Sequence, residues 1–211
     1  MHPDVQQGHR PRRAHRPPGD AAQDPVLSLD LPDPPLADER IRLRELAGDD
    51  LPDLVAACRD PLVQRYTRIP ADYREEDGRA FIGGAPGRRA RGESIELAVA
   101  GVGRGGRLLG AIGLVIDRHD HARAEVGYWV APWARSAGVA GRALSLISGW
   151  ALGPLGLARL DLYASVSNAA SLRVAERCGF VREGTLRKAW FRGPAREDLA
   201  VFSLLPQDLP G

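Results

Sequence analysis

The alternation of apolar and polar positions predicts an ordered series of strands between residues 39 and 205. Residues 41–46 alternate apolar with charged side chains, which is typical of a half-buried strand. Later apolar stretches predict further strands, and the last two are joined through Gly193 and Pro194. These strands cover residues 94–100, 107–116, 124–130, 157–165, 180–186 and 198–205.

Helices are predicted where apolar residues recur at helical spacing. The first opens at a pair of aspartates followed by Pro52, because acidic residues and proline suit the unpaired N–H groups of a first turn. The second is expected to stop at Gly83 and Gly84. The helices cover residues 49–60, 75–82, 138–152 and 168–178. The resulting order, β-α-α-β-β-β-α-β-α-β-β, indicates a mixed α/β sheet.

Residues 1–37 differ in composition from the rest of the chain. They hold eight of the 17 prolines, no aromatic residue and no hydrophobic periodicity. Such a segment buries too little apolar surface to fold, so we expect a disordered extension, a folded domain at residues 38–206 and a C-terminal tail at residues 207–211. The early arginines are also compatible with a basic arm that contacts RNA, but nearby aspartates offset them and favour a solvated tail. No apolar segment follows the basic stretch, so no secretory signal is predicted.

The overall charge and the cysteine content exclude several classes of partner. The 211 residues include 29 basic and 27 acidic side chains, for a formal net charge of +2, so no strong field attracts nucleic acid or a membrane surface. No apolar run approaches the roughly 18 residues that a membrane span needs. Cys58 and Cys178 match neither a C-x-x-C motif nor a disulfide framework, which favours reduced thiols and a cytoplasmic location.

The segment 101–106 matches the G-x-G-x-x-G pattern of dinucleotide-binding loops. That mechanism needs a helix directly after the glycines to receive a pyrophosphate. Residues 107–116 instead have the pattern of a strand, so we interpret the glycines as a flexible hairpin turn.

Asp117, His119, Asp120 and His121 cluster between two predicted strands. Histidines two residues apart in an extended loop point in opposite directions, and no third group of ligands is evident. A solvated turn is therefore favoured over a metal site, and no metal is expected.

Residues 135–142 have the composition of a phosphate-binding loop between a strand and a helix. Small residues such as Gly138 let the backbone approach an anion, and the N–H groups of the first helical turn are unpaired. Arg135 and Arg142 add positive charge to that of the helix dipole. Glycine also favours a tight strand-to-helix turn without a ligand, and the spacing alone leaves both interpretations open.

Four sequence elements, taken in order, resemble a known family. They are residues 124–130, the pattern Arg135-x-x-Gly138-x-Ala140, residues 168–171, and residues 178–180 followed by Glu183 and Gly184. Their order and separation are similar to those of the GNAT superfamily of acetyl-CoA-dependent N-acetyltransferases. Within it the chain most resembles the RimJ/RimL branch, which acetylates protein N-terminal amines among other targets. The resemblance covers residues 39–205 and implies the GNAT fold, α/β (α+β), in which helices flank a central mixed, largely antiparallel and splayed sheet.

The resemblance also implies a site for acetyl-CoA as the acyl donor. The pyrophosphate loop of the family maps to Arg135, Gly138 and Ala140. In the family, the strand before this loop splays from its neighbour, and the pantetheine arm bonds to the exposed strand backbone. An asparagine at the start of the next helix touches the cofactor near the thioester. The residues expected to bind the cofactor are therefore Trp129, Val130, Ala131, Arg135, Ser136, Gly138, Ala140, Gly141, Arg142 and Asn168.

Glu125 is the candidate general base. A protonated amine attacks a thioester only after it loses a proton, so a base has to lie within reach. Strand alternation places Glu125 on one face with Gly127 and Trp129, and its position matches the general base of related family members. Backbone N–H groups near Val130 would stabilise the oxyanion that develops. The alternative is that Glu125 only pairs with an arginine such as Arg123.

Ser171 is the candidate proton donor to the departing thiolate. Many family members have a tyrosine four residues before the Gly-Phe pair that follows the last helix, but this chain has Ala175 there. Ser171 is a substitute used in the RimJ/RimL branch, although a serine in the first turn of a helix is also a common cap. A thiolate is a tolerable leaving group, so a reaction without a dedicated acid also stays open.

We predict an N-acetyltransferase that moves an acetyl group to a primary amine by direct attack in a ternary complex. The acceptor is a protein N-terminus or a small amine, bound by residues 60–67 and by the hairpin around Trp190 and Phe191, which are alternatively core or dimer contacts. The protein is expected to be a monomer or a homodimer without nucleic-acid or membrane partners. A non-catalytic acyl-CoA-binding or regulatory domain is the alternative, because the family tyrosine is missing.

Overall fold

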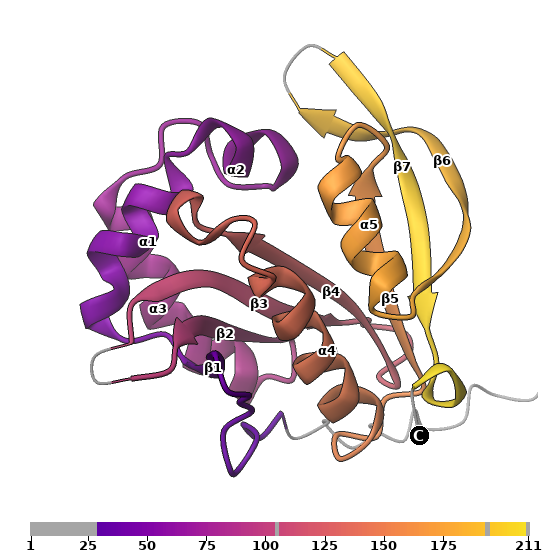
Figure 1. Ribbon diagram of the computed structural model, residues 1–211, viewed down its shortest axis with the longest axis horizontal. Coiled ribbons are helices and arrows are strands. Elements are labelled where there is room, and N and C mark those ends of the chain that lie inside the picture. The colour runs from indigo at the N-terminus through magenta and orange to yellow at the C-terminus, as the bar shows by residue number, and fades with distance from the viewer. Residues whose placement is uncertain (1–28, 104–105, 193–194, 210–211) are drawn as a thin grey trace, which may run out of the picture.

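A single sheet is the framework of the structure, a computed structural model that describes residues 29–103, 106–192 and 195–209 (Figure 1). Within these residues the strands lie in the order β1-β2-β3-β4-β5-β7-β6. They are β1 Ile41–Glu45, β2 Ser94–Gly101, β3 Leu108–Ile116, β4 Arg123–Val130, β5 Arg159–Ser165, β6 Val181–Arg192 and β7 Ala195–Leu204. Neighbouring strands are antiparallel except β4 and β5, which run parallel. The predicted mixed, largely antiparallel sheet is confirmed.

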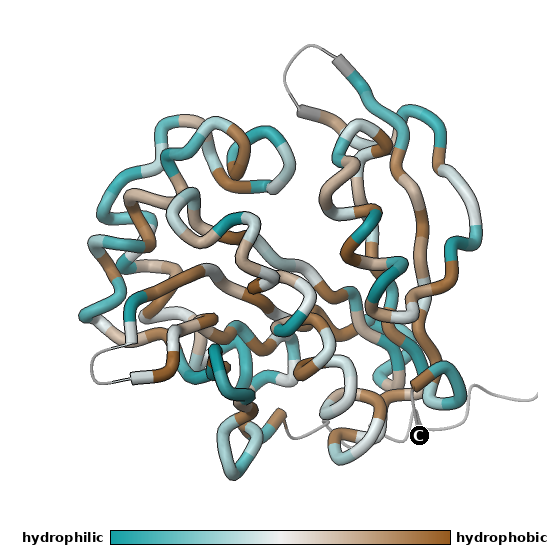
Figure 2. Tube along the Cα trace, viewed as in Figure 1, coloured by the Kyte–Doolittle hydropathy of each residue, from teal (hydrophilic) through white to brown (hydrophobic). Residues whose placement is uncertain are grey.

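Helices cover both faces of this sheet. They are α1 Leu51–Cys58, α2 Pro61–Tyr66, α3 Glu75–Ala90, α4 Val139–Leu152 and α5 Ala169–Arg177. α1 and α3 enclose a small core with Ala98 and Leu108 on one face, while α4 and α5 cover a larger core on the other. The hydrophobic segments follow the central strands in Figure 2. None of the helices in the described residues is long and apolar enough to cross a membrane.

β4 and β5 pair over a short stretch and then diverge. Their parallel register begins at Arg123 and ends where Glu125 lies beside Asp161. Beyond this point the two strands separate, and Figure 1 shows the gap widening between β4 and the unit formed by α5, β5, β6 and β7. The splay that the family resemblance implied is therefore present.

α3 is longer than its sequence pattern predicts. It does not stop at residue 82 but continues past two glycines and Pro86 to residue 90. Arg88, in the continued part, pairs with Glu96 of β2 at 2.9 Å and donates to the Phe81 carbonyl at 3.1 Å. The pair with β2, together with this bond inside the helix, offsets the low helix propensity of glycine and proline.

α2 is a helix that the sequence pattern did not predict, because Asp60 and Pro61 were interpreted as the end of α1. In the structure Asp60 caps α2, since its carboxylate accepts hydrogen bonds from the backbone N–H groups of Leu62 and Val63 at 3.0 Å each. Proline suits the first helical position that follows such a cap. The described part of the chain thus has one α-helix more than the predicted order.

The segment before β1 contributes to the core. Leu29 is 3% exposed, and Leu31 and Leu36 pack against the larger core. The Leu36 carbonyl also accepts the N–H of Leu43 at 2.7 Å. The predicted disordered extension at residues 1–37 is therefore wrong for residues 29–37, while residues 1–28 lie outside the described part of the chain. At the other end Leu209 packs on the same core, so the domain also continues beyond residue 206.

The glycine-rich segment 101–106 connects β2 to β3. The Gly101 N–H donates to the Arg107 carbonyl at 3.2 Å, as in a hairpin. β3 begins at Leu108, so the described residues after the glycines form a strand and not the helix that a dinucleotide loop needs. Residues 104 and 105 lie outside the described part.

Candidate active site

A large cavity opens where β4 and β5 diverge. Its volume is about 1520 Å³, which exceeds the roughly 300–1,000 Å³ of a pocket for one small ligand. Residues of β4 and β5 line it together with α2 and α3 on one side, and with α5 and the loop before α4 on the other. The cavity therefore has room for two reactants that meet at the splay.

The predicted phosphate loop borders this cavity. Gly138 is the N-cap of α4 and has a left-handed backbone with a φ of 75°, a conformation that favours glycine. The Arg142 N–H donates to the Gly138 carbonyl, so the N–H groups of the three residues before Arg142 have no intrahelical partner. The predicted loop residues that line the cavity are Arg135, Ser136, Gly138, Ala140 and Gly141. Together with the helix dipole, these N–H groups are suited to a phosphate.

Arg135 lines the cavity, and its guanidinium forms an ion pair with Asp60, the cap of α2. Burial alone would raise the pKa of Asp60, but the hydrogen bonds from Arg135 and from backbone N–H groups outweigh it and lower the pKa. Asp60 is therefore ionised at neutral pH. Arg135 joins the phosphate loop to α2 and has only part of its donor capacity left for a ligand.

Arg142 lies away from the cavity. It donates to Asp38 at 2.7 Å and to Glu39 at 2.6 Å, two carboxylates that precede β1. It is absent from the described residues that line the cavity. The structure therefore does not support the predicted contact between Arg142 and a cofactor, because the carboxylates of Asp38 and Glu39 bind the guanidinium.

Two of the three residues in the predicted strand backbone border the cavity. Trp129 and Val130 line the cavity. Ala131 is fully buried, its N–H donates to the Leu109 carbonyl at 2.8 Å, and its carbonyl accepts the Ala134 N–H at 2.9 Å. The Ala131 N–H is thus unavailable to a pantetheine arm, which corrects the prediction for this residue.

Glu125 points into the cavity from β4. Val126 packs in the larger core and Trp129 against the smaller one, so Glu125 shares the α1 and α3 face with Trp129, as strand alternation predicts. Arg123 does not pair with Glu125, because its guanidinium forms an ion pair with Asp161. Among the described residues Glu125 has no hydrogen-bond or ion-pair partner. Its carboxylate is therefore free to meet a ligand.

Asn168 and Ser171 lie where α5 begins, beside the splay. The Asn168 Oδ1 caps the helix by accepting the N–H of Ser171 at 3.2 Å. Ser171 is thus not the cap, and its Oγ lies 2.9 Å from the hydroxyl oxygen of Tyr128 on β4. Ala175, which replaces the family tyrosine, is fully buried and does not border the cavity.

Tyr128 lines the cavity and was not predicted as a site residue. The motif directed attention to Glu125 and Gly127 on one face of β4. The same alternation places Tyr128 on the opposite face, toward the helix that carries Ser171. Strand alternation was therefore the signal that could have found it.

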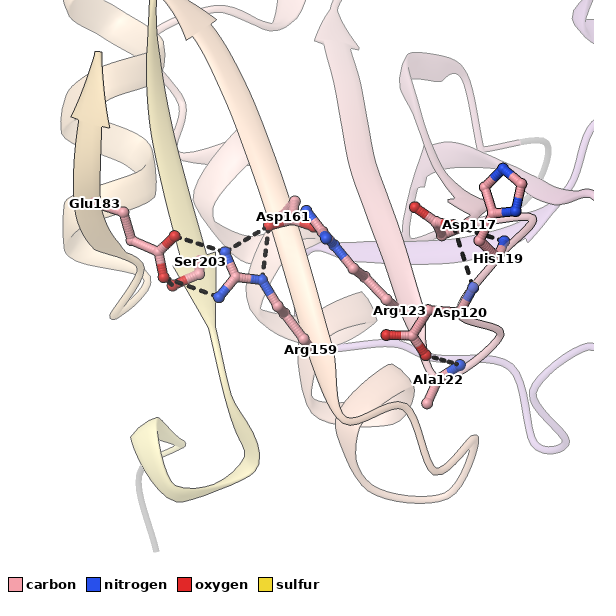
Figure 3. A network of polar contacts seen from close by, with 9 residues as sticks. All are labelled: Asp117, His119, Asp120, Ala122, Arg123, Arg159, Asp161, Glu183 and Ser203. Carbon is pink, nitrogen blue, oxygen red and sulfur yellow. Dashed lines mark hydrogen bonds and ion pairs between the residues drawn. The ribbon is translucent and has the colours of Figure 1, made fainter. Parts of the chain in front are cut away.

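A network of charged residues closes the narrow end of the splay (Figure 3). Asp161 of β5 is 2% exposed and binds both Arg123 of β4 and Arg159. Arg159 continues the network to Glu183 at 2.9 and 2.7 Å, and Glu183 accepts a further bond from Ser203 at 2.7 Å. The hydrogen bonds from Arg159 and then Ser203 lower the pKa of Glu183 to about 2. The network ties β4 to β5 and β5 to the last two strands.

The cluster that includes His119 and His121 forms a turn between β3 and β4 (Figure 3). The Asp117 carboxylate accepts the N–H groups of His119 at 2.8 Å and Asp120 at 3.2 Å, and Asp120 accepts that of Ala122 at 3.1 Å. These carboxylates hold the turn. In the described ranges no group of three or more His, Cys, Asp or Glu side chains is placed to hold a metal ion.

α2 and the β6–β7 hairpin face each other across the wide end of the cavity (Figure 1). The Tyr66 hydroxyl donates to the Ser167 carbonyl at 3.3 Å, and Arg65 pairs with Glu197 of β7 at 3.8 Å. Trp190 lines the cavity, whereas Phe191 is 63% exposed and lies outside it. Neither aromatic residue belongs to the core clusters of the described residues.

The fold and the site define a class of protein: a mostly antiparallel sheet that splays beside a glycine-initiated helix, the architecture of acetyl-CoA-dependent acetyltransferases. The sequence agrees, because a model of the acetyltransferase (GNAT) domain matches residues 40–181. This chain belongs to the GNAT acetyltransferase family, as the sequence motifs predicted.

Curated relatives match part of the chain. YdaF of Bacillus subtilis (strain 168), which carries the provisional name of a ribosomal N-acetyltransferase, is 33% identical over 112 residues, or 53% of this chain and 61% of YdaF. YoaA of the same organism, an uncharacterized N-acetyltransferase, is 32% identical over 98 residues, or 46% of this chain and 55% of YoaA. The matched segments thus span less than two thirds of either relative.

Solved structures share the fold at low sequence identity. RimL, a ribosomal L7/L12 alpha-N-protein acetyltransferase solved in complex with coenzyme A, has a TM-score of 0.72 and 19% identity, and the match covers 81% of this chain and 96% of RimL. The microcin C7 self-immunity acetyltransferase MccE, solved with acetyl-CoA and AMP, has a TM-score of 0.71 and 21% identity over 80% of this chain and 93% of MccE. The names RimL and YdaF agree with the predicted RimJ/RimL branch.

Proposed function

We propose that this chain transfers an acetyl group from acetyl-CoA to a primary amine by direct attack of the amine on the thioester. The observation that carries the proposal is Glu125, a carboxylate without a partner among the described residues, inside a cavity with room for two reactants. A direct attack in a ternary complex needs no covalent intermediate on the protein.

Acetyl-CoA would lie in the splay, with its pyrophosphate at the start of α4. The unpaired N–H groups after Gly138 and the positive end of the helix dipole favour an anion there. Asn168 lines the cavity near the other end of the donor. Its Oδ1 is used as the helix cap, so its NH₂ group is the part that can donate to a carbonyl of the cofactor.

Glu125 would accept the proton that the amine loses as it attacks the thioester carbon. The oxyanion that forms needs an N–H donor on the open side of β4. Successive N–H groups of a strand point to opposite sides, and the Ala131 N–H bonds to the segment of β3. The Val130 N–H therefore points toward the splay, where it can stabilise the oxyanion.

We further propose the N-terminal amine of a polypeptide as the acceptor. The names of RimL and YdaF support this class of substrate. The contacts between α2 and the opposite wall support it as well, because the Arg65–Glu197 pair is partly exposed and such pairs are worth only about 0–1 kcal/mol. α2 and β7 can therefore separate at low cost to admit a chain, while the ion pair between Arg135 and Asp60 keeps the start of α2 beside the phosphate loop.

The test is a screen of peptides with free N-termini against small amines, with release of free CoA as the readout. On the best acceptor, Glu125→Gln should lower the rate by about 10²-fold or more, the size of a general-base effect, and leave acetyl-CoA affinity within a few fold. Glu176→Gln, an exposed change on α5 outside the cavity, is the matched control and should leave the rate unchanged.

An unchanged rate in Glu125→Gln would remove Glu125 from the mechanism. If acetyl-CoA binds but no amine in the screen is acetylated, the non-catalytic acyl-CoA-binding alternative would replace the proposal.

A further inference from the structure

Tyr128 and Ser171 join β4 to α5 beside the splay. Their hydroxyl oxygens lie 2.9 Å apart, and both side chains line the cavity. Tyr128 lies on the face of β4 opposite Glu125. An amine enters and a thiolate leaves on different sides of the same carbon, so a base and a group that stabilises the thiolate belong on different sides of the splay.

Tyr128 remains protonated at neutral pH. Burial raises its pKa to about 12. A phenol is a stronger donor and a weaker acceptor than an aliphatic hydroxyl. Either oxygen can be the donor at this distance. The stronger donor strength of a phenol favours the arrangement in which Tyr128 donates to the Ser171 Oγ, which leaves the one proton of Ser171 to point elsewhere.

We propose that Tyr128 is a positioning residue, which holds the Ser171 Oγ by a donated hydrogen bond and so directs the Ser171 hydroxyl proton to the sulfur of the departing CoA thiolate. The inference rests on the proposed function, because it needs CoA in the splay.

In the step in which the thiolate leaves, the protein donates a hydrogen bond to the sulfur but does not transfer a proton to it. The carbon–nitrogen bond has formed, the carbon–sulfur bond breaks, and its electron pair goes to sulfur. The resulting thiolate accepts a hydrogen bond from Ser171, whose oxygen accepts one from Tyr128, and each bond in such a chain polarises the next. The thiolate takes its proton from solvent when CoA leaves.

The phenol beside Ser171 comes from β4 because α5 does not supply one. Ala175 is fully buried and does not border the cavity, so the helix supplies no phenol at that position. The Ser171 N–H is already used by the Asn168 cap, which fixes the backbone of the serine. Tyr128 then fixes its side chain.

The test is the pKa of the CoA thiol bound to the full chain, measured from the ultraviolet absorbance of the thiolate as pH is raised. A hydrogen bond from an oriented Ser171 favours the thiolate, so Tyr128→Phe should raise the pKa of the bound thiol by about one unit, equivalent to about 1.4 kcal/mol. Burial raises the pKa of Cys58 to about 12 and also raises that of Cys178. The same titration of each chain without CoA gives the absorbance of these thiols, which is subtracted.

Two further variants make the test specific. Ser171→Ala should raise the thiol pKa at least as much, and adding Tyr128→Phe to it should have no further effect. Tyr66→Phe removes another phenol that lines the cavity but bonds to the Ser167 carbonyl. It should leave the thiol pKa unchanged. CoA affinity, measured by calorimetry below the thiol pKa, should stay within a few fold in all variants.

An unchanged thiol pKa in Tyr128→Phe, with CoA affinity retained, would overturn the inference and leave the proposed function intact. So would an effect of Tyr128→Phe that persists in the Ser171→Ala background. A wild-type chain that does not bind CoA would overturn both proposals. A thiol pKa that shifts as expected in a protein that acetylates no amine would support the inference and refute the proposed function.

Discussion

Replacing Asp161 by asparagine removes the central charge of the network at the narrow end of the splay. Asp161 is 2% exposed and is bound by Arg123 and Arg159 (Figure 3). Asparagine has a similar shape but no charge to balance two guanidinium groups. We expect Asp161→Asn to lower the free energy of unfolding of the domain.

The structure sets the size of this effect. Removing one partner of a buried ion pair costs about 3–5 kcal/mol, because the other charge stays buried. Arg159 keeps its two hydrogen bonds to Glu183, and the Arg123 side chain is 37% exposed, so water solvates part of its charge. We therefore expect a loss of about 2–3 kcal/mol, below the range for a fully buried pair.

Glu183→Gln is the matched control in the same network. The Glu183 side chain is 42% exposed, so its loss should cost about 0–1 kcal/mol, as for surface ion pairs. The assay is urea unfolding of the full chain and both variants at neutral pH, with equal m-values as the sign that the unfolded states are alike. If Asp161→Asn costs no more than Glu183→Gln, the buried charge does not hold the strands together.

Glu183→Gln should also change how the stability of the domain depends on pH. The pKa of Glu183 is lowered from 4.5 to about 2 in the folded chain. The stabilisation from this group is therefore complete above about pH 4.5 and is lost as pH falls toward 2. Glu183→Gln should remove this part of the acid dependence of stability. An identical acid dependence in wild type and Glu183→Gln would show that the lowered pKa contributes nothing.

Three further predictions test the loop and the amino-terminal boundary. Gly138→Glu should abolish acetyl-CoA binding, because it places a carboxylate in the loop at a left-handed position; undiminished affinity by calorimetry would refute the pyrophosphate site. Arg142→Gln should leave that affinity within a few fold, because Asp38 and Glu39 hold the guanidinium; a large loss would put Arg142 in the site. A chain that begins at residue 38 should melt about 3–12 °C below one that begins at residue 29, because burying a leucine such as Leu29 contributes about 1.5–3 kcal/mol; equal melting temperatures would contradict the packing of residues 29–37.

Local periodicity was enough to predict most of the fold. The strand pattern around Glu125 gave the correct assignment of β4 residues to the two faces of the sheet. The errors occur where a distant contact decides the local structure. α3 continues past its glycines because Arg88 reaches β2, and Leu29 is a single buried residue in a proline-rich segment that has no period. Neither contact leaves a pattern in the neighbouring sequence.

The site shows the same division between local and distant determinants. Gly138 and Asn168 act through backbone conformation and helix capping, which depend on adjacent residues and can be predicted from a motif. Arg142 is held by Asp38, 104 positions away, and Tyr128 bonds a serine 43 positions away. The direction of these side chains depends on which elements the sheet brings together, so the motif alone did not predict it.

The width of the cavity depends on contacts at both of its ends. At the narrow end the network around Asp161 ties β4 to β5 where their register stops. Beyond that point the strands no longer bond to each other, and the hydrogen bond between Tyr128 and Ser171 links β4 to α5 instead. The charged network at the narrow end and the hydroxyl pair between β4 and α5 hold the walls together, while the weak contacts of Arg65 and Tyr66 leave the wide end free to open. Loss of the network should therefore affect stability more than the thiol pKa, and loss of the Tyr128 hydroxyl should affect the thiol pKa more than stability.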